Sequence, residues 1–343
     1  MAYPGSMTEI LTTTPGLYPL PDWAKDELPN LKGRQKGGLV TGDEGPEVED
    51  AYQRAREEVV DLQTEAGVDL PVEGQLRWDD MLTHPLSVAD AVETRGIVRY
   101  FDNNNFYREP VVTDDLSATG DVAAELESAA DLTDEGLNAV LPGPYTLSQL
   151  ATDENYGDDA EFLSALADFL AAEAEQFPDV ETLFLLEPSL LESPPGEGED
   201  ERASEAIDAV ASAADADVVA HTYWESHGGD GGIDEKVYAH LLDADIDAVG
   251  FDFVANHEDN AYVIGEYGCT DDIALGIVDG QNTLVEDADK IAERVEWTLD
   301  QAHGSDFDTA YAAVNTPTFY LPSGKFEQKL AALGAVERTE VTA

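Results

Sequence analysis

The chain has 343 residues, 43% of them hydrophobic, so it can bury the core of a sizeable α/β domain. Asp and Glu number 74 against 17 Lys and Arg, a formal net charge of −57. This balance excludes nucleic acid as a partner, because phosphate binding needs clustered Lys and Arg. The many large apolar residues argue against disorder, and we interpret the charge as a surface adapted to high salt.

Cysteine use and hydropathy restrict the class further. Cys269 is the one cysteine of the sequence, so this chain cannot form an internal disulfide or supply two thiolates to a zinc site. An apolar run of about 18 residues and a charged-then-apolar leader are both absent, which predicts a cytoplasmic protein without membrane contact. Residues 1–6 precede a second methionine and are predicted to be a tag, with 7–343 forming a single domain.

Short apolar runs alternate with amphipathic stretches, a pattern typical of βα units around a parallel sheet. Eight runs are predicted to be strands: 10–14, 70–74, 139–142, 182–186, 217–223, 248–252, 273–278 and 311–315. The helices predicted around them include 47–66, 88–100, 121–132, 158–176, 201–214 and 325–333. Together these elements predict an α/β protein, a single (β/α)8 TIM barrel with N-terminal and rim insertions.

Three stretches are predicted to lie outside the regular units. Residues 32–50 should form a surface loop, and 101–112 an insertion rich in asparagine and aromatic residues. The aromatic side chains of that insertion could line a pocket or cover the end of the barrel. The glycine-rich stretch 228–232 lacks the Gly-Lys-Ser/Thr ending of a phosphate-binding loop, so it is predicted to be a rim loop.

Polar residues follow most of the predicted strands. In an α/β barrel the carboxyl ends of all strands share one rim, where catalytic groups lie. The catalytic candidates are His221, Asp252 and Glu187, because an imidazole near carboxylates can act as a general base or bind a metal. The candidate substrate-binding residues are Thr13, Gln75, Tyr223, Asp279 and Asn315.

Each candidate also has a purely structural interpretation. A histidine at a strand end can be a hydrogen-bonded core residue, and carboxylates in so acidic a chain can cap loops or form ion pairs. A zinc site built from His221, Asp252 and Glu187 would rest on topology alone, without a signature spacing. The functional interpretation therefore depends on these side chains converging.

Several strand-end motifs resemble the cobalamin-independent methionine synthase family. In chain order they are TTTPG at 12–16, AGVD at 66–69, GQLRWDDM at 74–81, YFDNNNFY at 100–107, GPYT at 143–146, EPSL at 187–190 and GIVDGQN at 276–282. The resemblance runs from residue 10 to about 330 and is closest to the N-terminal, non-zinc barrel and to archaeal stand-alone forms. It implies methyl transfer to the homocysteine thiol, activated in the family by a zinc ion that lowers the thiol pKa.

The resemblance also implies that the zinc site is incomplete here. A family histidine falls on His221 and a family glutamate on Asp252, whereas the two cysteine positions hold Tyr223 and Thr318. Without thiolates, zinc binding by this chain is doubtful. Residues 17–21, where the N-terminal barrel of the family has a basic motif suited to a polyglutamylated folate, contain no cation.

Three interpretations of function remain open. The first is a barrel for methionine biosynthesis that works with a second, zinc-bearing chain and takes its methyl group from a short folate-like pterin or a methylated corrinoid. The second is an independent barrel enzyme that uses His221, Asp252 and Glu187 on another small substrate. The third is a non-catalytic binding subunit whose rim groups are structural.

Overall fold

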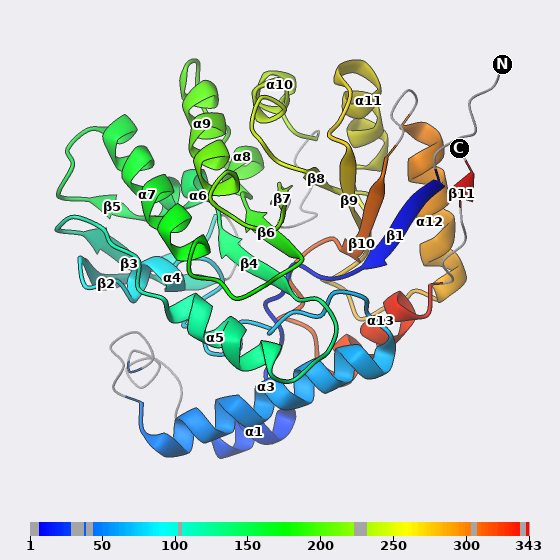
Figure 1. Cartoon of the computed structure of the whole chain (residues 1–343), viewed down its shortest axis with the longest axis horizontal. Coiled ribbons are helices and arrows are strands. Elements are labelled where there is room, and N and C mark those ends of the chain that lie inside the picture. Colours follow the sequence, from blue (N-terminus) through cyan, green and yellow to red (C-terminus); the bar gives the residue numbers. More distant parts are fainter. Residues whose placement is uncertain are drawn as a thin grey trace.

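The computed structural model describes residues 7–28, 38, 44–101, 105–222, 232–302, 307–336 and 341–342. A curled parallel sheet forms the centre, and helices cover its outer face (Figure 1). Its strands follow the order β1 (Met7–Thr12), β10 (Thr309–Val314), β9 (Asp272–Val278), β8 (Ala248–Asp252), β7 (Asp217–His221), β6 (Thr182–Leu186) and β4 (Asn138–Pro142). The short β11 (Val341–Thr342) pairs antiparallel with β1.

The strands are buried because both faces of the sheet are covered. Every residue of β4, β6 and β8 is buried, which explains why these strands are largely apolar and do not alternate between apolar and polar residues. Neighbouring strands pair in parallel register, so that Leu186 at the end of β6 lies beside His221 at the end of β7. The carboxyl ends of the strands therefore share one edge of the sheet, as the sequence predicts.

The predicted helices of the outer layer are confirmed, apart from 88–100. The longer ones are α3 (Pro46–Ala66), α5 (Asp121–Ala130), α7 (Asp159–Ala174), α9 (Glu199–Ala211), α11 (His257–Tyr267), α12 (Ala288–Gln301) and α13 (Ser323–Gly334). The shorter ones are α1 (Asp22–Glu27), α4 (His84–Ser87), α6 (Pro144–Leu150), α8 (Ser189–Glu192) and α10 (Glu235–Leu241). Aspartates cap several of them, as Asp158 does by accepting from the amides of Ala160 and Glu161. Within the described residues, no helix has the length and apolar character needed to cross a membrane.

The predicted strand at 70–74 does not form a strand ladder, so an eight-stranded barrel is not confirmed. This segment lies between β1 and β4, where the amide of Leu70 donates to Thr12 O at 3.1 Å and Pro71 O accepts from Asn138 at 3.0 Å. The side chain of Gln63 on α3 accepts a hydrogen bond from the amide of Val72 at 2.9 Å and donates one to the carbonyl oxygen of Val72 at 2.8 Å. Because a helix side chain satisfies these groups, they are not available to a neighbouring strand.

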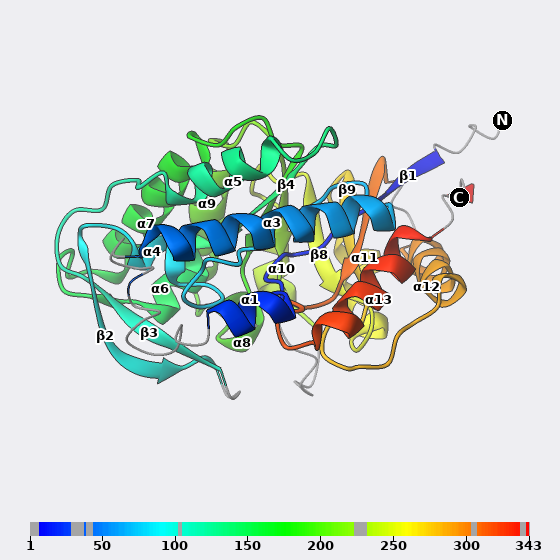
Figure 2. The same ribbon diagram turned by 90° about the horizontal axis from the view of Figure 1, so that it is seen from below.

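The prediction of a helix at 88–100 was wrong. The chain forms β2 (Val92–Arg99) and β3 (Phe106–Val112), an antiparallel hairpin that also carries β5 (Thr152–Asp153) along β3. Figure 2 shows this hairpin protruding from the helical layer. Its β-branched residues favour extended backbone, and pairing along nearly the whole of β3 overrides the helical pattern. Residues 1–6, 228–231 and most of the predicted loop 32–50 lie outside the described residues.

Candidate functional site

His221 is buried at the carboxyl end of β7. Its carbonyl oxygen accepts the amide of Glu187 at 2.8 Å, and its ring packs 5.9 Å from the ring of Phe184. Burial lowers the pKa of the imidazole to about 3, so the ring is neutral at physiological pH. A neutral imidazole can accept a hydrogen bond or bind a cation, whereas a group with this pKa is a poor general base at neutral pH.

Glu187 follows β6 and is completely buried. Its carboxylate accepts the amides of Tyr145 at 2.9 Å and Thr146 at 2.7 Å, which begin helix α6. A side chain on Gly143 would put its Cβ within 2.2 Å of the carboxylate, so this position requires glycine. Burial raises the pKa of Glu187 to about 7 against the effect of these hydrogen bonds. Glu187 thus supports a loop structurally, yet it can exchange a proton near neutral pH.

Asp252 and Asn315 meet at the ends of β8 and β10. Asn315 Nδ2 donates to Asp252 Oδ1 at 3.2 Å, and the same oxygen accepts the amides of Val254 at 2.8 Å and Ala255 at 3.2 Å. Burial raises the pKa of Asp252, which these donors partly offset. The pair is thus held from the ends of two strands and by the backbone that follows β8.

Gln75 and Thr13 are buried in roles that hold the rim together. Gln75, in the left-handed region at φ 50°, accepts the amide of Leu17 at 2.8 Å. Thr13 Oγ1 donates to Leu70 O at 2.8 Å and accepts from Asn138 Nδ2 at 3.1 Å. Thr13 therefore belongs to a core network, and its predicted role in binding substrate has no direct contact to support it.

Asp279 directs its carboxylate into its own loop. Its Oδ1 accepts the amides of Gln281 at 2.8 Å and Asn282 at 3.2 Å, and its Oδ2 accepts from the Asn282 side chain. This is the loop-capping alternative that the sequence left open. Tyr223, the last of the predicted substrate-binding residues, lies outside the described residues.

The candidates therefore separate into two groups. His221, Glu187, Asp252 and Asn315 gather at neighbouring strand ends, with Glu187 joined to His221 through the backbone and Asn315 joined to Asp252 through its side chain. Thr13 and Asp279 serve the architecture around them. The three catalytic candidates therefore lie at the ends of the neighbouring strands β6, β7 and β8, and their catalytic role stays a prediction.

A pocket of about 470 Å³ opens on the same rim, between the loops that follow β1, 70–74 and β10. Gln75 is the predicted site residue among its lining residues. The aromatic side chains of Trp78, Phe106 and Phe319 line it. Lys25 and the two neighbouring aspartates Asp79 and Asp80 line it as well. Phe106 was left open as a pocket residue by the sequence, whereas Trp78, Phe319 and Lys25 were missed. Trp78 and Phe319 each follow a predicted strand by a few residues, and this position could have indicated that they line the rim.

A buried carboxyl group holds Gln75 at the pocket wall and was not predicted. Glu73 is 2% exposed, accepts the amide of Gln75 at 2.8 Å and lies 3.7 Å from Nε of Arg56. Burial, reinforced by the charge of Glu125 on α5, raises the pKa of Glu73 to about 7. This carboxyl group thus fixes the strained residue at the pocket wall.

The positions that the resemblance assigns to zinc do not fit the metal here. Thr318 is buried, and among the described residues its hydroxyl has no hydrogen-bond partner. Asp252 Oδ1 already accepts three hydrogen bonds, and the Cys269 thiol contacts Thr270 at 3.6 Å instead of the strand ends. In the part of the chain that the structure describes, no three His, Cys, Asp or Glu side chains are placed to hold a metal ion. We therefore derive no chemistry from zinc bound by this chain.

Comparison with proteins of known sequence finds relatives that are methionine synthases. A methionine synthase from Sulfolobus acidocaldarius is 26% identical over 176 residues, which cover 51% of this chain and 50% of that relative. A methionine synthase from Saccharolobus islandicus is 21% identical over 294 residues, covering 84% of this chain and 83% of the relative. The first alignment spans about half of its relative, and the second spans most of it.

Solved structures show the same fold. A B12-independent methionine synthase from Shewanella sp. W3-18-1, in complex with selenomethionine, superposes with a TM-score of 0.77 at 19% identity and covers 96% of this chain and 97% of that one. A putative vitamin-B12 independent methionine synthase from Listeria monocytogenes gives 0.62 at 20% identity, with 93% of each chain covered. Residues 10–309 also match the family described as cobalamin-independent synthase, catalytic domain. The chain therefore belongs to the cobalamin-independent methionine synthase family.

Proposed function

We propose that this chain takes part in methionine biosynthesis by methyl transfer to the thiol of homocysteine. The observation that carries the proposal is that His221 and Asp252 lie at the ends of adjacent strands, within a chain matched to the family over residues 10–309. The relatives named above are methionine synthases, in agreement with this assignment. Glu187, with its pKa near 7, is the group at these strand ends that can exchange a proton at neutral pH.

The methyl donor is proposed to bind in the rim pocket. Its volume of about 470 Å³ lies in the range of roughly 300–1,000 Å³ that is usual for small-molecule sites. Trp78, Phe106 and Phe319 offer aromatic surfaces on which a flat ring can stack. A folate-like pterin suits these walls better than a methylated corrinoid, whose macrocycle is much larger than a pterin. Lys25 is paired with Asp22 at 3.0 Å, which disfavours a donor with a long anionic tail.

A second chain is proposed to supply the zinc ion. Two features support this partner: the thiolate positions of the family hold other residues here, and large aromatic side chains remain exposed around the pocket. Phe106 is 53% exposed, Phe319 42% and Tyr320 40%. Aromatic residues are enriched where protein surfaces meet, so a partner that covers the rim would also exclude water from the donor.

The proposal includes two further points of architecture and environment. The eight-stranded barrel that the sequence predicts is supported by the backbone bonds that residues 70–71 make with Thr12 on one side and Asn138 on the other. The acidic surface is proposed to be an adaptation to high salt, because a net charge of −57 needs strong screening.

Metal analysis combined with a thiol-methylation assay tests this function. The purified chain is assayed alone and after addition of a zinc-bearing relative from the same organism, with homocysteine and a methylated pterin. We expect little zinc and little activity alone, and methionine formation in the mixture. Stoichiometric zinc with full activity of the isolated chain would contradict the partner. Activity on another small substrate alone would favour an independent enzyme, and the absence of any effect in the mixture would favour a non-catalytic subunit.

A further inference from the structure

A buried ion pair lies behind the loop that follows β9. Lys329 of α13 is 2% exposed, and its Nζ lies 2.7 Å from Oε2 of Glu286. The same ammonium group donates to the carbonyl oxygen of Leu284 at 2.6 Å. A lysine is rarely buried this deeply unless it is paired. The pair therefore ties α13 to this loop.

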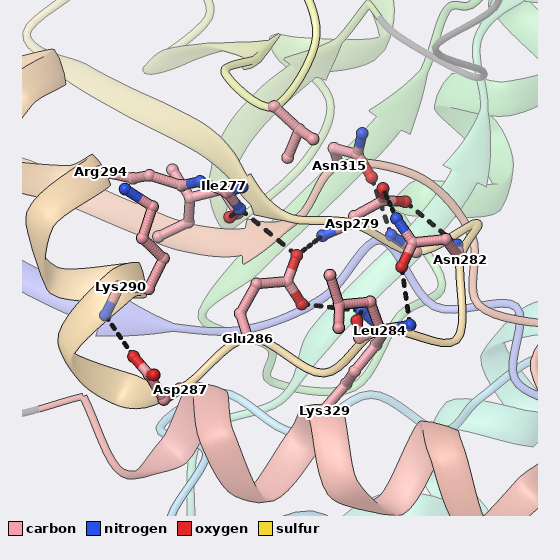
Figure 3. A network of polar contacts seen from close by, with 12 residues as sticks. Ile277, Asp279, Asn282, Leu284, Glu286, Asp287, Lys290, Arg294, Asn315 and Lys329 are labelled. Atoms are coloured by element: carbon pink, nitrogen blue, oxygen red, sulfur yellow. Dashed lines mark hydrogen bonds and ion pairs between the residues drawn. The ribbon is translucent and has the colours of Figure 1, made fainter.

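The second oxygen of Glu286 holds the beginning of the loop. Its Oε1 accepts the amide of Asp279 at 3.0 Å and faces Arg294 of α12 at 3.4 Å, while Arg294 also donates to the carbonyl oxygen of Ile277. Figure 3 shows Glu286 between these groups. Although burial favours the protonated acid, the hydrogen bonds from Lys329 and Asp279 hold the pKa of Glu286 below its ordinary value. The carboxylate thus stays charged and connects α12, α13 and the end of β9 through hydrogen bonds and ion pairs.

The loop in turn fixes the side chain of Asn315. The amide of Gly280 donates to Asn315 Oδ1 at 2.9 Å, and since an amide N–H can only donate, this contact sets which way the Asn315 amide points. Its Nδ2 then faces Asp252 Oδ1 at 3.2 Å. Gly280 cannot be replaced without moving the loop, because a Cβ there would lie 2.5 Å from the carbonyl oxygen of Thr316.

The contacts of Asp252 show what this arrangement accomplishes. Its Oδ1 receives Asn315 together with the amides of Val254 and Ala255. Among the described residues, the hydrogen bonds to the Asp252 carboxylate are all accepted by Oδ1, so Asn315 and the two amides together set how this carboxylate is oriented. We infer that Glu286 is a positioning residue for Asp252, acting through the loop after β9 and through Asn315. The importance of Asp252 itself rests on the proposed function.

Amide hydrogen exchange measured on the full chain without substrate tests this inference. In Glu286→Gln, exchange should accelerate by about tenfold or more at Gly280 and also at Val254 and Ala255, since a loss of about 1.4 kcal/mol of protection corresponds to tenfold. Exchange within β8 should not change. Acceleration confined to Asp279, with Val254 and Ala255 unchanged, would overturn the inference and leave Glu286 as a local loop anchor.

Two variants make the test independent of how well Glu286→Gln folds. Asn315→Ala removes the hydrogen bond between Asn315 and Asp252. It should therefore accelerate exchange at Val254 and Ala255, while the amide of Asp279 stays protected by Glu286. Unchanged exchange at Val254 and Ala255 in this variant would also overturn the inference. Glu293→Gln is the matched control, because Glu293 pairs with Lys290 at 3.1 Å on the exposed side of α12.

Kinetic measurements separate this inference from the proposed function. If methyl transfer is observed, Glu286→Gln should lower kcat more than it raises KM, because Asp252 would be misdirected while the pocket remains intact. A merely structural role would lower the fraction of active protein without changing KM or the exchange at Val254 and Ala255. Methyl transfer that is absent from the wild-type mixture, together with the expected exchange pattern, would contradict the proposed function and leave the positioning role of Glu286 standing.

Discussion

Replacing Glu187 by glutamine should change how the stability of the protein depends on pH. The carboxyl group is fully buried, and it accepts the amides of Tyr145 and Thr146. Burial raises its pKa from 4.5 to about 7, so between these two values the folded chain holds a proton that the unfolded chain releases. The contribution of Glu187 to stability is therefore fully present at pH values below 4.5 and is lost as the pH rises through 7.

The size of the effect follows from the displacement of the pKa. A change from 4.5 to about 7 corresponds to about 3 kcal/mol in total. Between pH 5.5 and 8.5, a range that avoids precipitation near the isoelectric point, about 2 kcal/mol of this should be lost. Glutamine cannot titrate, so Glu187→Gln should lack this part of the pH dependence. The variant will also lose one hydrogen bond to a backbone amide, which lowers its stability at every pH.

Urea denaturation at constant high salt measures the difference directly. The free energy of unfolding of the wild type minus that of Glu187→Gln should fall by about 2 kcal/mol from pH 5.5 to pH 8.5. Glu73 also titrates near pH 7, but it is present in both proteins and cancels in the difference. A difference that is independent of pH would refute the reasoning, because Glu187 would then titrate at its ordinary pKa.

Substitutions at four other positions have expected outcomes that can be measured. Gly143→Ala should destabilise the fold by about 2–4 kcal/mol, because its Cβ displaces the Glu187 carboxylate. By contrast Gly265→Ala, in α11 with no atom within 4 Å of the new Cβ, should stabilise it by roughly 0.5–1 kcal/mol; both are checked by urea denaturation. Phe319→Ala should weaken binding of a methylated pterin about tenfold in calorimetric titration, whereas Tyr262→Ala, at an exposed aromatic residue of α11 outside the pocket, should not. Thr318→Val should raise the free energy of unfolding by about 1 kcal/mol, because it removes a buried hydroxyl that has no partner among the described residues. A loss of stability there would show that the hydroxyl is satisfied.

Much of the fold could be predicted because parallel strands buried on both faces consist mainly of apolar residues, which form recognisable runs in the sequence. The runs at 139–142, 182–186 and 248–252 are largely apolar and buried, and each lies in a strand. The run at 70–74 was also predicted to be a strand, but Gln63 satisfies the backbone of Val72 from a helix, a tertiary contact that no local pattern reveals. The hairpin was missed because the segment 92–99 becomes a strand only by pairing with 106–112, and the sequence of 92–99 alone does not show this pairing.

The site was predicted less completely, because a strand end places a residue on the rim without saying where its side chain points. His221, Glu187 and Asp252 lie at strand ends as predicted, and their role in catalysis stays a prediction, while Asp279 caps its own loop. Glu286 is separated in sequence from Asn315 and Asp252, so its connection to them appears only in three dimensions. The role of Glu73 was missed because its burial and its contact with Arg56 of α3 appear only in the folded chain.

The most direct test of the central claim is the rate of methionine formation from homocysteine in a mixture of this chain with a zinc-bearing relative. We expect that the wild-type chain supports the reaction and that His221→Ala abolishes it. His240→Ala, on α10 near Asp200 and Asp243, should retain the wild-type rate. An unchanged rate with His221→Ala, in a protein whose folding is confirmed by circular dichroism, would contradict the claim that these strand ends form the active site.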